Sequence, residues 1–136
     1  MAELDCNPSS EDLKKLLSKP WQKFLAKFDE INSLKTSQWK EVHILGFICQ
    51  RYEKLYGKKF GLSFKGAPSK CPEIYLIKKI YVMLDTTNPR LVRDYIEWVF
   101  KWKIEPKQVK FRTLGFFTTP GFANEFTLAQ QQAQKI

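Results

Sequence analysis

Apolar positions along this chain recur with the spacing of amphipathic helices. Apolar side chains return at every third or fourth position over residues 21–31, and a second such stripe runs over residues 39–56. Three to four residues per repeat is the period of an α-helix, so each stripe predicts a helix with one buried face. Thr36 or Ser37 is the expected cap of the second helix, and Gly57 is the expected stop signal after it.

The same pattern predicts further helices on both sides of these two. Residues 9–19 begin with a capping-box-like Ser and Asp pair and continue with leucines at helical spacing. Residues 73–84 are apolar on nearly every side, which predicts a helix at the centre of the domain. Asn88 and the proline after it suit the start of a helix over residues 89–103. A last helix is expected after Gly121.

Few positions follow the two-residue alternation of a β-strand. Residues 60–64 and 109–114 alternate in this way, so they allow one short β ribbon. The sequence therefore predicts a mainly α fold, a single compact domain of five or six helices over residues 1–136. We expect residues 1–8 and 129–136 to be frayed ends, because large apolar residues are sparse there.

The net positive charge of the chain, +9, lies entirely in its middle. Residues 51–112 carry 15 Lys and Arg against 6 Asp and Glu, a difference of +9. Residues 1–50 carry seven of each sign, and residues 113–136 carry one of each. A positive charge confined to one segment is typical of proteins with a polyanionic partner, most often nucleic acid.

Some of these cations are expected to be neutralised on their own helix. Within residues 89–103, opposite charges stand four residues apart in three pairs, which favours a solvated face of mixed charge. The pairs are Arg90 with Asp94, Arg93 with Glu97, and Glu97 with Lys101. The cations left over form two clusters that we expect to contact phosphates, Lys58, Lys59, Lys65 and Lys70 in one loop and Lys103, Lys107, Lys110 and Arg112 in a later stretch. The alternative is a lysine-rich surface that serves solubility. The two clusters would meet if the helices over 73–84 and 89–103 packed antiparallel.

Aromatic residues are interleaved with these cations. Trp102 and Phe111 lie beside the second cluster, so we expect them to be possible stacking platforms for bases. The alternative is that such rings belong to the core, as the spacing of Trp98 with earlier apolar residues on its helix indicates. Residues 115–122 combine two glycines with three phenylalanines. They predict either a tight connection whose rings fill the core or an exposed aromatic loop.

The sequence contains no pattern typical of catalysis or of cofactor binding. No phosphate-binding glycine loop or dinucleotide motif is present, and three widely spaced cysteines with a single histidine form no zinc motif. His43 lies within a predicted helix, where a packing or surface role is expected. No apolar run approaches the ~20 residues of a membrane span, and the acidic N-terminus does not resemble a signal peptide. We expect no metal, no cofactor and free thiols in a reducing, cytoplasmic setting.

Two functional hypotheses follow from these observations. The first is a small, non-enzymatic protein that binds nucleic acid, either DNA or RNA, as an accessory factor in replication or transcription. The second is a protein-interaction adaptor or inhibitor whose basic face docks on an acidic protein partner. Both would hold for a factor that bridges nucleic acid and a replication or transcription protein. Neither hypothesis involves a membrane.

Overall fold

The computed structural model describes residues 19–62 and 67–134, which confirm the mainly α fold. This part of the chain contains five α-helices and no β-strand. The helices are α2 (Lys19–Ala26), α3 (Glu41–Tyr56), α4 (Pro72–Met83), α5 (Pro89–Val99) and α6 (Phe122–Gln134). The helix expected over residues 9–19 and the frayed residues 1–8 lie outside the described residues, apart from Lys19. At the other end, residues 129–134 are helical as part of α6.

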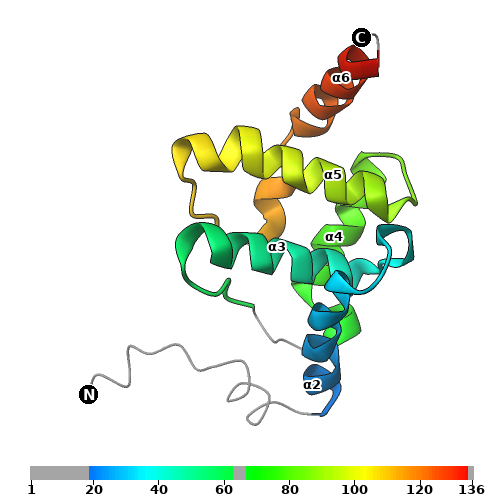
Figure 1. Ribbon diagram of the computed structural model, residues 1–136, viewed down its shortest axis with the longest axis vertical. Coiled ribbons are helices and arrows are strands. Elements are labelled where there is room, and N and C mark those ends of the chain that lie inside the picture. Colours follow the sequence, from blue (N-terminus) through cyan, green and yellow to red (C-terminus); the bar gives the residue numbers. More distant parts are fainter. Residues whose placement is uncertain (1–18, 63–66, 135–136) are drawn as a thin grey trace.

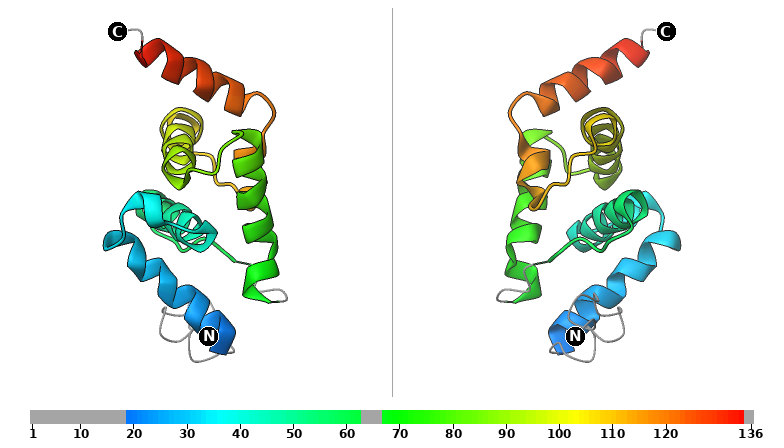
Figure 2. Two further views of the ribbon diagram at one scale, coloured as in Figure 1. Left: turned by 90° about the vertical axis from the view of Figure 1, so that its right-hand side faces the viewer. Right: turned by 90° about the vertical axis from the view of Figure 1, so that its left-hand side faces the viewer.

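Helices α3 and α5 lie side by side at the centre and run in the same direction (Figure 1). Helix α4 crosses both of them on one side, with α2 at one end of the molecule and α6 at the other (Figure 2). The side chains with no exposed surface come mostly from the two central helices, namely Ile44, Leu45 and Ile48 of α3 and Val92, Tyr95, Ile96 and Val99 of α5. The centre of the domain is therefore formed by α3 and α5.

The expectation that residues 73–84 form the central helix is wrong. Helix α4 buries Ile74, Ile77 and Ile80, but Tyr75 is 66% exposed and Val82 is 77% exposed. Its apolar residues are spread around the whole helix, whereas only one side of it meets the rest of the molecule (Figure 2). Apolar composition alone therefore did not indicate which helix is enclosed.

Helix α3 begins later than the cap signals predict. Residues Thr36–Gln38 form a separate 3₁₀ turn, and the helix starts at Glu41. The first turn is closed by His43, whose Nδ1 accepts the backbone N–H of Lys40 at 2.9 Å. At the other end Gly57 has φ of 71°, in the left-handed region that glycine adopts without strain. The predicted end of the helix is thus confirmed.

The β ribbon expected between residues 60–64 and 109–114 is not formed by the described residues of these segments. The two segments nevertheless touch, because the rings of Phe60 and Phe111 lie 5.4 Å apart in the core. The backbone of Val109 has other partners, since its N–H donates to the Ile104 carbonyl at 3.1 Å and its carbonyl accepts the Tyr56 hydroxyl. The described parts of the two segments are therefore joined by side-chain packing and not by the backbone hydrogen bonds of a β ribbon.

Of the rings in residues 115–122, Phe117 is buried and Phe116 and Phe122 are half-buried against the core, which supports the first of the two interpretations of this stretch. Leu114–Thr118 form a 3₁₀ helix, and Phe117 has no exposed surface. The Tyr95 hydroxyl of α5 donates to the Phe117 carbonyl at 2.6 Å. This buried hydrogen bond fixes the connection between α5 and α6 against the central helices.

None of the helices in the described ranges is long and apolar enough to cross a lipid bilayer.

Candidate nucleic-acid interface

Segments that carry part of the two predicted basic clusters, the start of the loop after α3 and the stretch after α5, lie together where α3 and α5 both end (Figure 1). Lys58 directly follows α3, while Lys107, Lys110 and Arg112 belong to the segment after α5, and all four side chains are exposed. Lys54 and Lys101, on the last turns before these segments, are exposed as well. We call this set the basic end, which consists of Lys54, Lys58, Lys101, Lys107, Lys110 and Arg112.

Direct contacts hold the two halves of the basic end together. The Tyr52 ring of α3 lies 5.2 Å from the Phe111 ring, and the Lys110 ammonium lies 5.9 Å from the centre of the Tyr56 ring. Arg51 also reaches Glu105 across the same junction, at 3.7 Å. Burial, and to a lesser extent Tyr52 and Glu105, raise the pKa of Tyr56, so its hydroxyl stays protonated as a donor.

The geometry that brings the clusters together differs from the one expected. From the sequence, we expected the two basic clusters to meet only if α4 and α5 packed antiparallel. Helix α4 instead crosses both α3 and α5 (Figure 2). The clusters meet because α3 and α5 run in the same direction, so the segments that follow them leave from the same end (Figure 1). The convergence is therefore partial, and a different pair of helices produces it.

Three of the predicted phosphate-binding lysines lie elsewhere or are engaged. The Lys103 ammonium pairs with Glu125 of α6 at 2.8 Å and lies 5.5 Å from the centre of the Trp98 ring. Lys70 is exposed but belongs to the 3₁₀ turn Pro68–Lys70, which packs beside α2. Lys59 is half-buried and has interactions within the molecule. The fourth residue, Lys65, lies outside the described residues.

Sequence reasoning also set aside Lys101, a cation that the structure leaves exposed. Lys101 was expected to pair with Glu97, but within the described residues the ion pair found on α5 joins Arg93 to its neighbour Asp94, at 2.9 Å. The ammonium of Lys101 instead lies 5.3 Å from the centre of the Trp102 ring. The prediction from charge spacing therefore gave too many neutralised cations on this helix.

The two residues proposed to stack on bases have opposite environments. Trp102 is 58% exposed on the last turn after α5, so its indole ring is accessible. Phe111 is only 6% exposed and packs against the rings of Phe60, Phe100 and Phe117, so the expectation that it stacks on bases is corrected. Successive side chains of this segment point to opposite sides. The Phe111 ring therefore lies in the core, while Lys110 and Arg112 lie at the surface.

A second basic region was missed by sequence analysis altogether. A groove of about 300 Å³ lies between α2 and α4 and is lined by Lys23, Lys27, Lys40 and Lys78. We call it the lysine groove. Three of these lysines come from residues 1–50, which are neutral overall, so counting charge by segment hid them. A helical-face analysis of α2 would have shown Lys23 and Lys27 one turn apart.

Beside it lies a second groove, of about 680 Å³, whose lining is more acidic. Glu41 and Asp85 line this groove together with Tyr81 and Trp39. Burial, and then the nearby Glu41, raise the pKa of Tyr81 to about 12, so the phenol is neutral at ordinary pH. Lys40 and Glu41 border both grooves and mark the boundary between them.

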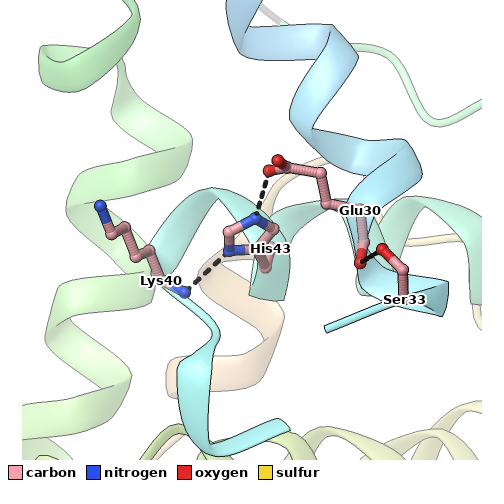
Figure 3. Close-up of polar contacts among 4 residues, drawn as sticks. All are labelled: Glu30, Ser33, Lys40 and His43. Atoms are coloured by element: carbon pink, nitrogen blue, oxygen red, sulfur yellow. Dashed lines mark hydrogen bonds and ion pairs between the residues drawn. The ribbon is translucent and has the colours of Figure 1, made fainter. Parts of the chain in front are cut away.

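His43 has a structural role that occupies both of its ring nitrogens (Figure 3). Nδ1 accepts the Lys40 N–H, which leaves the proton on Nε2, and Nε2 donates to the Glu30 carboxylate at 3.0 Å. The side chain is only 3% exposed. It ties the 3₁₀ turn Lys27–Asn32 to the first turn of α3, so the predicted packing role is confirmed.

The thiols and carboxylates of the described residues form no reactive cluster. Burial is the main factor that raises the pKa of Cys49, to about 12, and it raises the pKa of Cys71 too, so both thiols stay protonated at neutral pH. Among residues 19–62 and 67–134, no three His, Cys, Asp or Glu side chains are grouped as metal ligands would be.

Comparison with protein-family models, with curated proteins and with solved structures finds no match to this chain.

Proposed function

We propose that this protein binds nucleic acid through the basic end, without enzymatic activity of its own. The observation that carries the proposal is the meeting of exposed cations from two separate segments around the ends of α3 and α5. The carboxylates near this end include Glu105, which is paired with Arg51. Cations gathered in this way can each neutralise a phosphate and release its counterions.

The exposed indole of Trp102 adds a way to contact bases as well as phosphates. It is 58% exposed and stands one residue from Lys101, whose ammonium approaches the ring. Single-stranded nucleic acid offers unpaired bases that stack on such rings, whereas duplex hides them. We therefore propose a preference for single strands, with DNA or RNA as the polymer.

Fluorescence anisotropy with labelled oligonucleotides tests the proposal. The full chain is titrated with single-stranded DNA, single-stranded RNA and duplex DNA at several salt concentrations. We expect affinity to fall steeply with salt, by about 0.7 in the logarithmic slope for each single-strand phosphate neutralised and about 0.9 on duplex. Absence of binding at low salt, or an affinity that salt does not change, would refute the proposal.

A pair of double variants locates the interface. Lys58→Glu/Lys110→Glu reverses one cation from each half of the basic end. We expect it to weaken binding by roughly tenfold or more and to lower the salt slope. Lys35→Glu/Lys79→Glu reverses two exposed lysines outside the basic end and outside both grooves. Because the two variants have the same net charge, an equal loss in both would show a general effect of charge.

A further inference from the structure

The lysine groove combines an apolar floor with a basic rim. Its floor is formed by Phe24, Val42 and Ile74, which are 5–8% exposed, and is bordered by two prolines. Its rim carries the four lysines named above, all of them exposed, against the single carboxylate of Glu41. The groove is thus amphipathic, with mostly positive charge around an apolar centre.

The rim lysines have no carboxylate partner among the residues that the structure describes. The ion pairs of this part of the chain involve other residues, and no carboxylate of the described ranges lies within 4.0 Å of these four ammonium groups. The first turns of α3 and α4 also border the groove, through Val42 and Ile74. Helix N-termini carry partial positive charge, so the backbone adds to the field of the lysines.

The floor distinguishes a peptide from a nucleic acid as the occupant. The Phe24 ring packs edge-on against Trp21 at 5.2 Å and against Phe28 at 5.8 Å, so its face is held in the core. Nothing in this groove corresponds to the exposed indole of the basic end. A volume of about 300 Å³ suits one or two anchoring aliphatic side chains, since it lies at the lower limit of the ~300–1,000 Å³ of ligand pockets.

We propose that the lysine groove binds an acidic, amphipathic peptide segment of a partner protein. An apolar side chain of the segment enters between Phe24 and Ile74, and its flanking carboxylates face Lys23 and Lys27 on one wall and Lys78 on the other. This is the chemistry of groove recognition, in which apolar anchors supply affinity and charges supply orientation. The proposal does not depend on nucleic-acid binding at the basic end.

Selection from a phage-displayed library of random 12-residue peptides tests it on the full chain. We expect the enriched peptides to have net negative charge and at least one Leu, Ile, Met or Phe. A labelled peptide of the enriched sequence is then titrated by fluorescence anisotropy against three proteins, the unchanged chain, Lys23→Glu/Lys78→Glu and Lys58→Glu/Lys110→Glu. We expect a roughly tenfold or greater loss with the first variant and less than twofold with the second.

Several results would overturn the assignment. Selection without acidic enrichment, or a peptide affinity that Lys23→Glu/Lys78→Glu leaves unchanged, excludes the groove as the peptide site. If this variant weakens oligonucleotide binding as much as Lys58→Glu/Lys110→Glu does, the groove belongs to a nucleic-acid surface instead. Circular dichroism of each variant shows whether it is folded, and the milder Lys23→Gln/Lys78→Gln substitutes if the reversal unfolds the chain. Oligonucleotide binding and peptide binding are measured in separate titrations, so either proposal can be refuted without the other.

Discussion

At the basic end, exposed cations surround the last turns of α3 and α5, with the accessible Trp102 ring on the same turn as Lys101. In the lysine groove, four lysines surround buried apolar side chains at the first turns of α3 and α4. The two regions carry charge of the same sign on opposite ends of the central helix α3. They differ in the neutral side chains between the charges, which are an exposed indole at the basic end and a buried apolar floor in the lysine groove.

Positive charge alone therefore does not define the partner of either region. Both regions would attract a polyanion at long range, because the field of a cluster depends on its net charge. Recognition at short range depends on the neutral groups between the cations, which select stacked bases or aliphatic anchors. The following substitutions separate the two regions by changing these neutral groups, or the contacts that hold the charges in place.

The largest expected effect comes from Phe111→Ala, which removes the ring that joins both halves of the basic end. Loss of a buried aromatic side chain costs about 3–5 kcal/mol of unfolding free energy, measured by urea denaturation. If Phe111 stacked on bases, as the sequence suggested, the variant would keep its stability and lose only affinity for oligonucleotides. An unfolding free energy within about 0.5 kcal/mol of the original would therefore contradict its place in the core.

His43→Ala is expected to lower the stability of the chain around the lysine groove. It removes the acceptor for the Lys40 N–H and the donor to Glu30, at a cost of about 1–3 kcal/mol. Because Glu30 belongs to the turn that follows α2, we expect peptide binding in the lysine groove to suffer more than oligonucleotide binding. His43→Asn keeps an acceptor near the position of Nδ1, so it should recover part of the stability. Equal losses in both variants would argue against this role of Nδ1.

Trp102→Ala tests the neutral group of the basic end. Loss of one stacked base costs ~1–3 kcal/mol of binding free energy, roughly a 5- to 150-fold loss of affinity for single strands. Duplex binding and unfolding free energy should hardly change, because the ring is 58% exposed. Tyr75→Ala is the matched control, since Tyr75 is an exposed aromatic residue on α4. The stacking role is excluded if both variants bind single strands equally well.

The smallest effect is expected for Glu125→Gln, which tests the boundary of the basic end. The pair of Lys103 and Glu125 is half-exposed, and such pairs contribute about 0–1 kcal/mol. Lys103 also lies over the rings of Trp98 and Phe122, so it should remain in place. We expect oligonucleotide affinity in anisotropy titrations to change less than twofold. A large gain would show that Lys103 can join the phosphate contacts, as the sequence analysis proposed.

Most helices could be predicted from the sequence, because their signals are local. Gly57 ends α3, and the Asn88 side chain accepts the Arg90 backbone N–H at 3.0 Å as the cap of α5. The start of α3 could not be predicted in the same way. Thr36 and Ser37 had the residue types of a cap, but the acceptor is His43, whose ring is fixed by Glu30 from another turn.

The candidate sites were predictable only in part. Lys58, Lys107, Lys110 and Arg112 were identified as exposed cations from their place in a basic segment, and the segments that carry them follow helix ends that lie on the same side. The engagement of Lys103 by Glu125 and the burial of Phe111 depend on residues far away in the sequence. The lysine groove is lined by residues from three α-helices and two 3₁₀ turns, so no single segment shows its charge.

Local signals in the sequence were enough to predict the helical class, the helix ends marked by glycine, asparagine and proline, and the excess of positive charge in the middle of the chain. These properties follow from interactions within a few residues, such as backbone caps and the helical period. The shared direction of α3 and α5, the burial of particular rings and the set of lysines around one groove became visible only in the folded chain. Those properties arise from side-chain packing between distant segments, as in the contact of Tyr52 with Phe111, which local periodicity does not encode.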